Sequence, residues 1–455
     1  MKKVLIANRG EIAVRIIRAC HDMGLQTVAV YSQVDAEALH VLHADEAICI
    51  GEAPSPKSYL RIPNILSACE ITGADAIHPG YGFLSENANF ASICESCGLN
   101  FIGPSPLAIA LLGDKSKAKS TAKKAGCPVI PGSDGIVTDL KEGLEEANKL
   151  GYPIFIKAVA GGGGKGIRIA HNEQEFIKLF PAARAEAEVS FANPEVYLEK
   201  MIMNPRHIEV QVLGDKHGNY IHLGERDCTI QRRRQKLIEE SPSPVLSPKL
   251  RQKIGQAAVS VVKEAKYFSA GTVEFLLDAD QNFYFMEVNA RIQVEHTVSE
   301  ELTGVDLVRE QLRIAMGEKL LLEQKQVEFK GHVIQFRINA ENPSQNFAPS
   351  PGRLEYYLPP GGPHVRVDSA CYSGYQIPPN YDSMIAKLIV KGKDRKEAMD
   401  VGKRALREFH IGGVYSTIPF HLYMLENENF IKSNYDLTYI DKLISEGCEF
   451  HLDDE

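Results

Sequence analysis

Two neighbouring apolar runs that each carry one glutamate constrain most strongly what this chain can fold into. Residues 272–276 and 283–288 are rich in β-favouring side chains, and a turn-forming stretch separates them. The pattern predicts a hairpin of two buried strands, with Glu274 in the first strand and Glu287 in the second. A buried unpaired carboxylate is costly, and two facing carboxylates repel unless a cation lies between them. Such oxygen ligands suit Mg²⁺ that arrives with substrate phosphates, so we predict a metal site on this hairpin.

Four polar residues at alternate positions follow the second run: Asn289, Arg291, Gln293 and Glu295. In a strand-like run they would point to one side. An arginine, two amides and a carboxylate beside a metal site are suited to chemistry on an anion. The alternative interpretation is a surface hairpin with solvated acids, and the apolar residues around both glutamates weigh against it.

Length and composition exclude several classes of protein. The chain has 455 residues, so we expect two or three domains. Its net charge of −8 gives no global attraction to nucleic acid or to anionic membranes, and its apolar runs are shorter than the ~20 residues of a membrane span. The nine cysteines are scattered, and Cys94 and Cys97 have no second pair at zinc spacing. We therefore expect two helix cysteines there and a cytoplasmic protein.

The first 112 residues alternate short apolar runs with helical patterns. Strands are predicted at 4–7, 27–31, 47–50, 76–77 and 100–102, and helices at 12–23 and 59–72. This rhythm predicts a parallel sheet with helices on both faces. The turn after the first strand contains only Gly10, so it lacks the three-glycine fingerprint of a nicotinamide-binding dehydrogenase.

The middle of the chain changes in texture. A basic helix is predicted at 115–124, and residues 153–170 are typical of a strand, a glycine loop and a second strand. Gly161–Gly164 are followed by Lys165 and Gly166, and because no Ser or Thr follows the lysine, this is not a Walker A loop. We favour a mobile lid over a triphosphate, against the alternative of a hairpin tip that binds nothing. Further strands are predicted near 196–200, 208–213 and 219–240, and helices at 173–189, 248–266 and 306–316; a charged linker, 318–330, precedes a β-rich third region with a helix at 394–409.

Several charged residues outside the hairpin also suggest a site. Lys157, in an apolar setting, and Lys115 would act as point charges on nucleotide phosphates, although a solvated surface lysine is the alternative for each. Arg337 lies in an apolar run, so a carboxylate or ligand partner is expected. His207 is a satisfied strand histidine by default, and the basic run 231–236 is either an anion site or a solvated turn.

Longer strings narrow the interpretation. The hairpin, the glycine loop and the paired lysines resemble those of ATP-grasp ligases, and five strings are similar to biotin carboxylase. They are Ile6–Ile12 (IANRGEI), His78–Asn87 (HPGYGFLSEN), Gly224–Cys228 (GERDC), Arg291–His296 (RIQVEH) and Pro379–Met384 (PNYDSM). The resemblance runs from about residue 2 to about residue 440. A carbamoyl-phosphate or amino-acid ligase is the second possibility within the superfamily, and HPGYGFLSEN and RIQVEH weigh against it.

The resemblance implies an α/β and α+β multidomain fold. Its parts would be a Rossmann-like pre-ATP-grasp domain at 1–113, an ATP-grasp domain at 114–317 with a lid at about 131–203, and a mainly β C-terminal domain at 331–446. The resemblance implies ATP, Mg²⁺ or Mn²⁺, bicarbonate as co-substrate and biotin as the carboxyl acceptor. A catalytically silent nucleotide-binding scaffold is the alternative outside the enzyme class, and the presence of all three key glutamates weighs against it.

Carried over position by position, the resemblance also implies the site residues. The metal ligands would be Glu274, Glu287 and Asn289. The catalytic residues would be Glu295, Arg337, Lys236 and Arg291. Nucleotide, bicarbonate and biotin contacts would be Lys115, Lys157, Gly163, Gly164, Glu199, Lys200, Ile202, His207, Gln231, Arg234, Leu276, Gln293, Val294 and Tyr81.

The expected partners follow from what the sequence lacks. The family's biotin-attachment motif, Ala-Met-Lys-Met, does not occur, and the chain ends soon after the third region. We therefore expect a free-standing subunit of acetyl-CoA carboxylase that acts on a biotin carboxyl carrier protein beside carboxyltransferase subunits, as a homodimer. Three positions depart from the family pattern: Arg234 replaces a histidine, Asn380 a tyrosine, and Pro363 an aromatic residue near the family's dimer contact.

Overall fold

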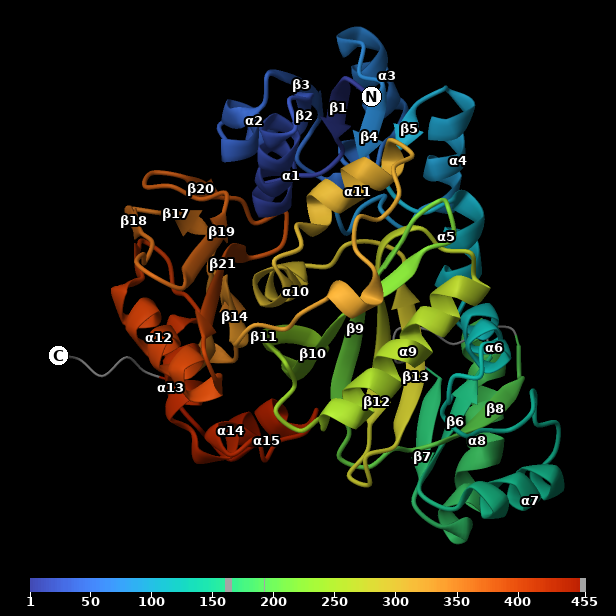
Figure 1. The fold of residues 1–455 in the computed structure, drawn as a ribbon. Helices are drawn as coiled ribbons and strands as arrows, with labels where there is room; N and C mark the ends of the chain where they lie inside the picture. Colours follow the sequence, from blue (N-terminus) through green and yellow to red (C-terminus); the bar gives the residue numbers. More distant parts are fainter. Residues whose placement is uncertain (160–165, 192, 451–455) are drawn as a thin grey trace. The chain divides into compact units, whose positions relative to one another are not determined.

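The computed structural model describes residues 1–159, 166–191 and 193–450. The predicted phosphate contacts Gly163 and Gly164 therefore lie outside the described residues. The chain forms two compact units (Figure 1). The larger unit consists of Met1–Cys127, Arg206–Phe275 and Glu287–Glu455, and the smaller unit of Pro128–Pro205 and Leu276–Met286.

Five parallel strands form the first sheet of the larger unit, in the order β3-β2-β1-β4-β5. They are β1 (Lys3–Ile6), β2 (Gln26–Ser32), β3 (Glu46–Gly51), β4 (Ala76–His78) and β5 (Asn100–Phe101). All five predicted strands are confirmed, and Val4, Leu5 and Ile6 are fully buried, as in parallel sheets covered on both faces. The helices of this part are α1 (Gly10–Asp22), α2 (Leu39–His43), α3 (Ile62–Thr72), α4 (Ala88–Ser96), α5 (Pro106–Gly113) and α6 (Lys115–Lys124).

Eight strands form the second sheet, in the order β13-β12-β9-β10-β11-β14-β21-β19. They are β9 (Arg206–Gly214), β10 (Tyr220–Arg232), β11 (Gln235–Ser241), β12 (Ser269–Leu277), β13 (Phe283–Asn289), β14 (His332–Asn339), β19 (Val365–Ser369) and β21 (Met384–Gly392). Because β12 and β13 are neighbours, the hairpin predicted from the two apolar runs is confirmed. Glu274 is buried in β12, whereas Glu287 in β13 is only partly buried.

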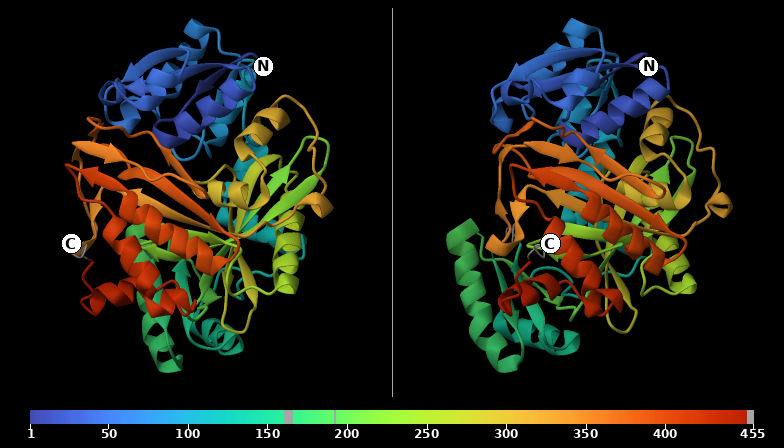
Figure 2. Two further views of the ribbon diagram at one scale, coloured as in Figure 1. Left: turned by 60° about the vertical axis from the view of Figure 1, so that its left-hand side comes forward. Right: turned by 90° about the vertical axis from the view of Figure 1, so that its left-hand side faces the viewer.

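The second sheet joins segments that are far apart in the sequence. Strand β11 pairs antiparallel with β14, and Ile238 lies opposite Phe336. The charged linker 318–330 lies between these two strands in the chain, so it does not separate two sheets. Helix α12 (Arg395–Glu408) packs on β14 and β21, and helix α9 (Pro248–Glu264) packs on β9 and β10 (Figure 2). Helices α10 (His296–Thr303) and α11 (Leu307–Ala315) follow the hairpin, and α11 shares a core with α1.

The C-terminal part contains elements that the sequence analysis did not predict. Helices α13 (Ile418–Glu426), α14 (Glu428–Ile431) and α15 (Tyr439–Ser445) follow α12. Short strands also lie here: β15 (Glu341–Asn342), β16 (Ala348–Pro349), β17 (Gly352–Arg353), β18 (Tyr356–Leu358), β20 (Gln376–Ile377) and β22 (His410–Gly412). The three helices bury aromatic side chains such as Phe420 and Phe430 in one core with β14 and β21.

The smaller unit is built on a three-stranded sheet, β7-β6-β8. Strands β6 (Ile154–Ala158), β7 (Ile167–Ala170) and β8 (Val196–Lys200) are antiparallel, as the strand, loop and strand pattern predicts. Helices α7 (Leu140–Leu150) and α8 (Glu173–Phe191) cover it. Phe176 and Phe180 of α8 are buried against Ile154 and Leu198.

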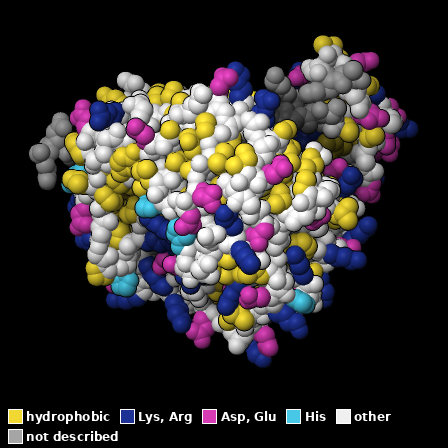
Figure 3. Space-filling model, turned by 90° about the horizontal axis from the view of Figure 1, so that it is seen from above, with side chains coloured by type: hydrophobic (Ala, Val, Ile, Leu, Met, Phe, Trp, Pro, Cys, Tyr) yellow, Lys and Arg dark blue, Asp and Glu magenta, His cyan; other side chains and the backbone are white. Residues whose placement is uncertain are grey.

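Among the helices of the described residues, none combines the length and the apolar character that crossing a membrane requires. Charged side chains of both signs are interspersed on the face shown in Figure 3.

Candidate functional site

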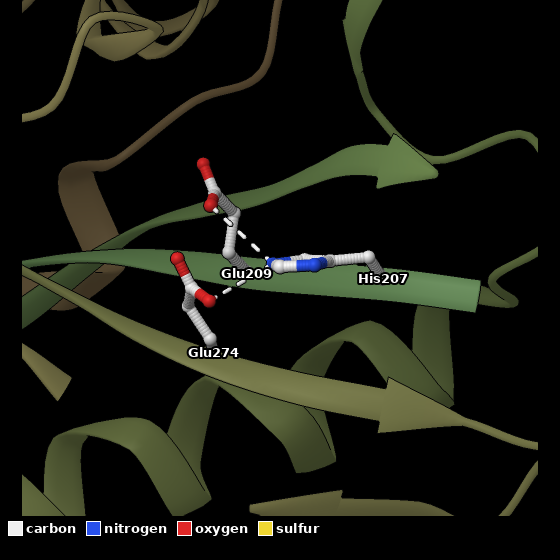
Figure 4. Close-up of side chains that lie close together, drawn as sticks. All are labelled: His207, Glu209 and Glu274. Carbon is white, nitrogen blue, oxygen red and sulfur yellow. Dashed lines mark ion pairs between the residues drawn. The ribbon is translucent and has the colours of Figure 1, made fainter. Parts of the chain in front are cut away.

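The side chains of His207, Glu209 and Glu274 meet on one face of the eight-stranded sheet (Figure 4). His207 and Glu209 are two residues apart in β9, so both point to the same side, and Glu274 comes from the neighbouring strand β12. The Nε2 atom of His207 lies 3.2 Å from Glu274 Oε2 and 3.9 Å from Glu209 Oε2, and all three residues are buried. The spacing alone would allow a metal ion.

The partners of these carboxylates favour an ion-pair network instead. Lys236 Nζ donates to Glu209 Oε2 at 2.6 Å and to Glu274 Oε1 at 3.3 Å. Arg226 Nε donates to the other oxygen of Glu209 at 2.5 Å. A metal between these residues would lie against the ammonium of Lys236, and Mg²⁺ prefers oxygen to imidazole ligands. His207 and Glu209 therefore line the inner wall of a charged site, and of the three residues only Glu274 is also a predicted metal ligand.

The predicted ligands Glu274, Glu287 and Asn289 fit a Mg²⁺ ion better. Burial and the nearby charge of Glu274 raise the pKa of the Glu287 carboxyl, and Lys115, whose Nζ lies 3.7 Å from Glu287 Oε2, opposes that rise. Repulsion between two carboxylates is what a divalent cation between them relieves. The Nδ2 group of Asn289 donates to Glu274 Oε1 at 2.8 Å and so holds that carboxylate in place.

Glu295 lies between two cations immediately before α10. Lys236 Nζ donates to its Oε1 at 2.6 Å, and Arg337 Nη2 donates to its Oε2 at 3.0 Å. Burial alone would raise the pKa of this carboxyl, but Lys236, Arg337 and Arg226 together hold the pKa well below its ordinary value. The group is therefore an ionised carboxylate at neutral pH, held between Lys236 and Arg337.

Arg337 also contacts a second carboxylate. Its Nε donates to Glu239 Oε1 at 2.6 Å, which confirms the prediction of a carboxylate partner for an arginine in an apolar strand. Burial raises the pKa of Glu239, although Arg337 opposes the rise. Since Arg337 bridges Glu239 and Glu295, its guanidinium is fixed in one orientation.

A second buried pair lies beside Tyr81. The hydroxyl of Tyr81 donates to Glu11 Oε1, and Lys387 Nζ lies 3.0 Å from Glu11 Oε2. Lys387 is fully buried and donates to the backbone oxygen of Val294 at 3.1 Å. This lysine therefore links the residue predicted to face biotin to the segment predicted to hold bicarbonate.

The structure corrects the prediction that residues 289–295 form a strand-like or extended run with side chains on one side. Strand β13 ends at Asn289, and the chain then turns. The turn still brings Gln293 Nε2 to Glu274 Oε1 at 3.0 Å, but it sends Arg291 Nε to Glu86 Oε2 at 2.8 Å. Gln293 and Glu295 thus reach Glu274 and Lys236 from the turn between β13 and α10, and not from an alternating strand.

The basic run 231–236 is also more structured than either interpretation from the sequence. Gln231 is the penultimate residue of β10 and Lys236 belongs to β11, so only Arg233 and Arg234 make the turn. Both have positive φ, 48° and 67°. Gln231 Nε2 approaches His207 Nδ1 at 3.5 Å, whereas Arg234 is exposed, as are Asn380 and Pro363.

The smaller unit contains the predicted nucleotide contacts Lys157, Glu199, Lys200, Ile202 and Leu276. Lys157 forms an ion pair with Glu199 across β6 and β8. Lys200 Nζ donates to the backbone oxygens of Gly151 and Tyr152 at 2.8 and 3.1 Å. Within this unit, both lysines therefore have fixed positions.

Sequence reasoning missed Glu11, Glu209, Arg226, Glu239 and Lys387. Each is a charged residue that the structure buries. Lys387, for example, lies within the run Met384–Gly392 (MIAKLIVKG). The argument that singled out Arg337 applies to Lys387 and could have found it, whereas the other four lie in elements of mixed polarity.

Three family models together match most of the chain. The model of the biotin carboxylase N-terminal domain matches residues 1–109, the model of the carbamoyl-phosphate synthase L chain ATP-binding domain matches 114–323, and the model of the biotin carboxylase C-terminal domain matches 335–442. A biotin carboxylase of Nostoc is 59% identical over 441 residues, covering 97% of this chain and 99% of the relative. The chain belongs to the biotin carboxylase family. Biotin carboxylase 1 of Bacillus subtilis is 57% identical over 97% of this chain and 98% of its own length.

Solved structures of the family have the same fold. The biotin carboxylase of Campylobacter jejuni, in a β,γ-ATP complex, is 49% identical, with a TM-score of 0.90 over 97% of this chain and 98% of that chain. The biotin carboxylase domain dimer of the 2-oxoglutarate carboxylase of Hydrogenobacter thermophilus, in complex with MgADP, ADP and bicarbonate, is 49% identical. Its TM-score is 0.89 over 100% of this chain and 99% of that chain. The predicted resemblance and fold class are confirmed.

Proposed function

We propose that this chain carboxylates biotin with bicarbonate while it cleaves ATP to ADP and phosphate, through a carboxyphosphate intermediate. The biotin is carried by a separate carrier protein, and the reaction is the first half-reaction of acetyl-CoA carboxylase in fatty-acid synthesis. The observation that carries the proposal is the placement of Glu295 between Lys236 and Arg337, beside the Glu274–Glu287 hairpin. The base, the two cations and the proposed metal ligands would then all lie within the larger unit.

Bicarbonate binds beside Lys236 and Arg337, the two cations that now contact Glu295. An anion that takes hydrogen bonds from Lys236, Gln293 and the Val294 backbone, with Arg291 at the rim, weakens the hold of Lys236 on Glu295. The pKa of Glu295 then rises from its depressed resting value, and the carboxylate can accept the bicarbonate proton. The oxygen that loses this proton becomes the nucleophile.

Phosphoryl transfer requires positive charge around the γ-phosphate. Glu274, Glu287 and Asn289 would hold the Mg²⁺ that accompanies ATP, or Mn²⁺ in its place, and the ion would neutralise phosphate charge. Lys115 and Lys157 neutralise the charge that spreads over the phosphoryl oxygens. The remaining proposed nucleotide contacts are Gly163, Gly164, Glu199, Lys200, Ile202, His207, Gln231, Arg234 and Leu276.

Biotin accepts the carboxyl group beside Tyr81 and Arg337. Carboxyphosphate breaks down to CO₂ and phosphate, and the phosphate removes the proton from the biotin nitrogen. The ureido oxygen then carries negative charge. Arg337, which Glu239 fixes in place, stabilises that charge without having to reorganise.

The larger assembly is part of the proposal. We place the N-terminal domain at 1–113, the ATP-grasp domain at 114–317 with its lid at about 131–203, and the C-terminal domain at 331–446. The partners are a biotin carboxyl carrier protein, carboxyltransferase subunits and a second copy of this chain. The exposed Pro363 would affect the strength of the dimer contact, where the family has an aromatic residue. No disulfide joins the nine cysteines, all of which lie among the described residues, and this suits the reducing cytoplasm.

One assay tests the reaction. Purified protein with MgATP should release ADP in a bicarbonate-dependent manner, and free biotin should raise the rate and yield carboxybiotin. ADP release that is independent of both bicarbonate and biotin would reject the proposal.

Replacing Glu287 by lysine should abolish metal-dependent nucleotide binding. The variant Glu287→Lys exchanges a metal ligand for a like charge, so we expect the affinity for MgATP to fall about 100-fold or more. The side chain is 39% exposed, so the hairpin should accept the lysine and the melting temperature should change little. Calorimetric titration measures the affinity, with Glu328→Lys, an exposed position with the same charge change, as control. An unchanged affinity would remove Glu287 from the metal site.

Replacing Arg234 by the family's histidine should be tolerated. Histidine accepts the left-handed conformation of this turn more readily than most side chains, so the backbone should not be strained. If the position supplies only a donor and positive charge to the nucleotide, turnover of Arg234→His stays within roughly tenfold, about 1.4 kcal/mol in the barrier. Nucleotide affinity should fall mildly above about pH 6.5, as the new histidine loses its charge.

Turnover and nucleotide affinity from pH 6 to 9 decide this point, with Arg233→His in the same turn as the control. A large gain in turnover for Arg234→His would mean that the histidine is chemically required, and that arginine weakens the enzyme.

A further inference from the structure

The string Gly224–Cys228 (GERDC) resembles the family, but no role for its central arginine follows from the sequence. Arg226 lies in β10 and is one of the largest fully buried side chains among the described residues. A buried guanidinium is costly unless its donors all have acceptors. The hydrogen-bond partners of Arg226 therefore show which side chains its charge holds in place.

All five N–H groups of Arg226 have acceptors, and each acceptor comes from a different residue. Nε donates to Glu209 Oε1 at 2.5 Å, Nη1 to Gln211 Oε1 at 2.7 Å and Ser299 Oγ at 2.8 Å, and Nη2 to Thr272 Oγ1 at 3.1 Å and Gln293 Oε1 at 3.0 Å. A lysine has only three donors on one atom and could not hold this set.

The bond to Gln293 fixes which way its amide faces. Because a guanidinium can only donate, it selects the orientation in which the carbonyl oxygen of Gln293 faces Arg226. The NH₂ group then points the other way and donates to Glu274 Oε1 at 3.0 Å. Gln293 thus presents donors, and not an acceptor, on the side where an anion would bind.

The bond to Glu209 sets the position of Lys236. Arg226 holds one oxygen of this carboxylate at 2.5 Å, and Lys236 contacts the other at 2.6 Å. Because the charge of Glu209 is shared with Arg226, the ammonium of Lys236 can also donate to Glu295 at 2.6 Å. The same arginine therefore acts on both side chains.

We propose that Arg226 is the positioning residue of the bicarbonate site, because it orients the amide of Gln293 directly and the ammonium of Lys236 through Glu209. The inference rests on the proposed function, since Gln293 and Lys236 are the side chains proposed to hold bicarbonate. Because all five donors of Arg226 are used within the protein, Arg226 contacts neither bicarbonate nor ATP. Its loss should therefore weaken bicarbonate binding without altering the nucleotide contacts.

The variant Arg226→Lys separates this role from a general structural one. It keeps the charge but loses the bond to Gln293, so the KM for bicarbonate should rise roughly tenfold or more, as for a lost charge-assisted hydrogen bond. The KM for MgATP should stay within about threefold. The control is Arg251→Lys, another largely buried arginine, which pairs with Glu225 of the same strand β10. It should leave both KM values unchanged.

A double-mutant cycle tests whether Arg226 acts through Gln293. If it does, Arg226→Lys should raise the bicarbonate KM much less in a Gln293→Ala background than in the wild type. Fully additive effects, or equal rises in the KM for bicarbonate and MgATP, would overturn the proposal.

Two further outcomes are distinguishable. Wild-type protein without bicarbonate-dependent ADP release would reject the proposed function itself. If Arg226→Lys does not fold, the variant Glu209→Gln tests the other arm of the proposal, because it weakens the carboxylate through which Arg226 positions Lys236. A rise in the bicarbonate KM alone supports the proposal, and no change in either KM contradicts it.

Discussion

The variant Glu295→Gln should lose biotin-dependent ATP cleavage by about 10²–10⁴-fold, the usual cost of removing a general base. The exchange keeps the size of the side chain, but it replaces the carboxylate that accepts the bicarbonate proton with a neutral amide that cannot. Lys236 and Arg337 retain other carboxylate partners, Glu209 and Glu239, so the site should not collapse. MgATP affinity, measured by calorimetry, should stay within about threefold of the wild type.

The pH dependence of the wild type adds a check. Because the pKa of Glu295 in the free enzyme is held well below its ordinary value, the group stays ionised from pH 6 to 9, and its titration should not shape kcat/KM for bicarbonate there. The stability that this ionised group contributes is present above its unfolded pKa and is lost as pH falls toward the folded pKa. The matched control is Glu225→Gln, a buried glutamate paired with Arg251, which should keep its activity. Near-normal turnover of Glu295→Gln would remove Glu295 from the role of base.

The variant Arg337→Lys should lose about 10²–10³-fold in biotin-dependent turnover. A lysine keeps a positive charge, but a single ammonium cannot reproduce the planar bridge between Glu239 and Glu295. Loss of one preorganised donor at a developing oxyanion has this magnitude. Lysine is preferable to methionine here, because methionine would leave Glu239 buried and unpaired, which costs about 3–5 kcal/mol of stability.

The comparison of two reactions localises the effect. Biotin-dependent turnover of Arg337→Lys should fall further than its biotin-independent ADP release, because only the former develops charge on the ureido oxygen. Arg395→Lys is the control, since Arg395 pairs with Glu240, the residue next to Glu239 in β11. An equal loss in both reactions would place Arg337 at the bicarbonate step alone.

Period and turn patterns in the sequence predicted much of the fold. Strands β1 to β5, the hairpin β12–β13 and helix α6 follow from alternation, helical spacing and turn residues, because these signals are local. The pairing of β11 with β14 could not be predicted, since no local signal specifies which strands far apart in the chain become neighbours. Helices α13–α15 were missed because their aromatic residues are buried against β14 and β21, and tertiary packing determines their conformation.

The site could be predicted only as residue types. Glu274 and Glu287 are evident because a carboxylate in an apolar strand is unusual, and the family strings supplied the other positions. Which side chain holds which could not be predicted: Glu295 lies with Lys236 and Arg337, whereas Arg291 donates to Glu86 and to Asn289. These contacts depend on the geometry of the turn after Asn289. The alternation of polar and apolar residues does not predict that geometry.

The continuous sheet from β13 to β19 bears on how the protein can be divided. Cutting the chain in the linker 318–330 would look safe from the sequence, because the linker is charged and partly exposed. The cut would separate β11 from β14, so each fragment would expose the open edge of a long strand. Such edges pair with any available strand and promote aggregation. The two fragments should therefore be soluble only when they are made together, and the part after the linker is not an independent cassette for transplantation into another enzyme.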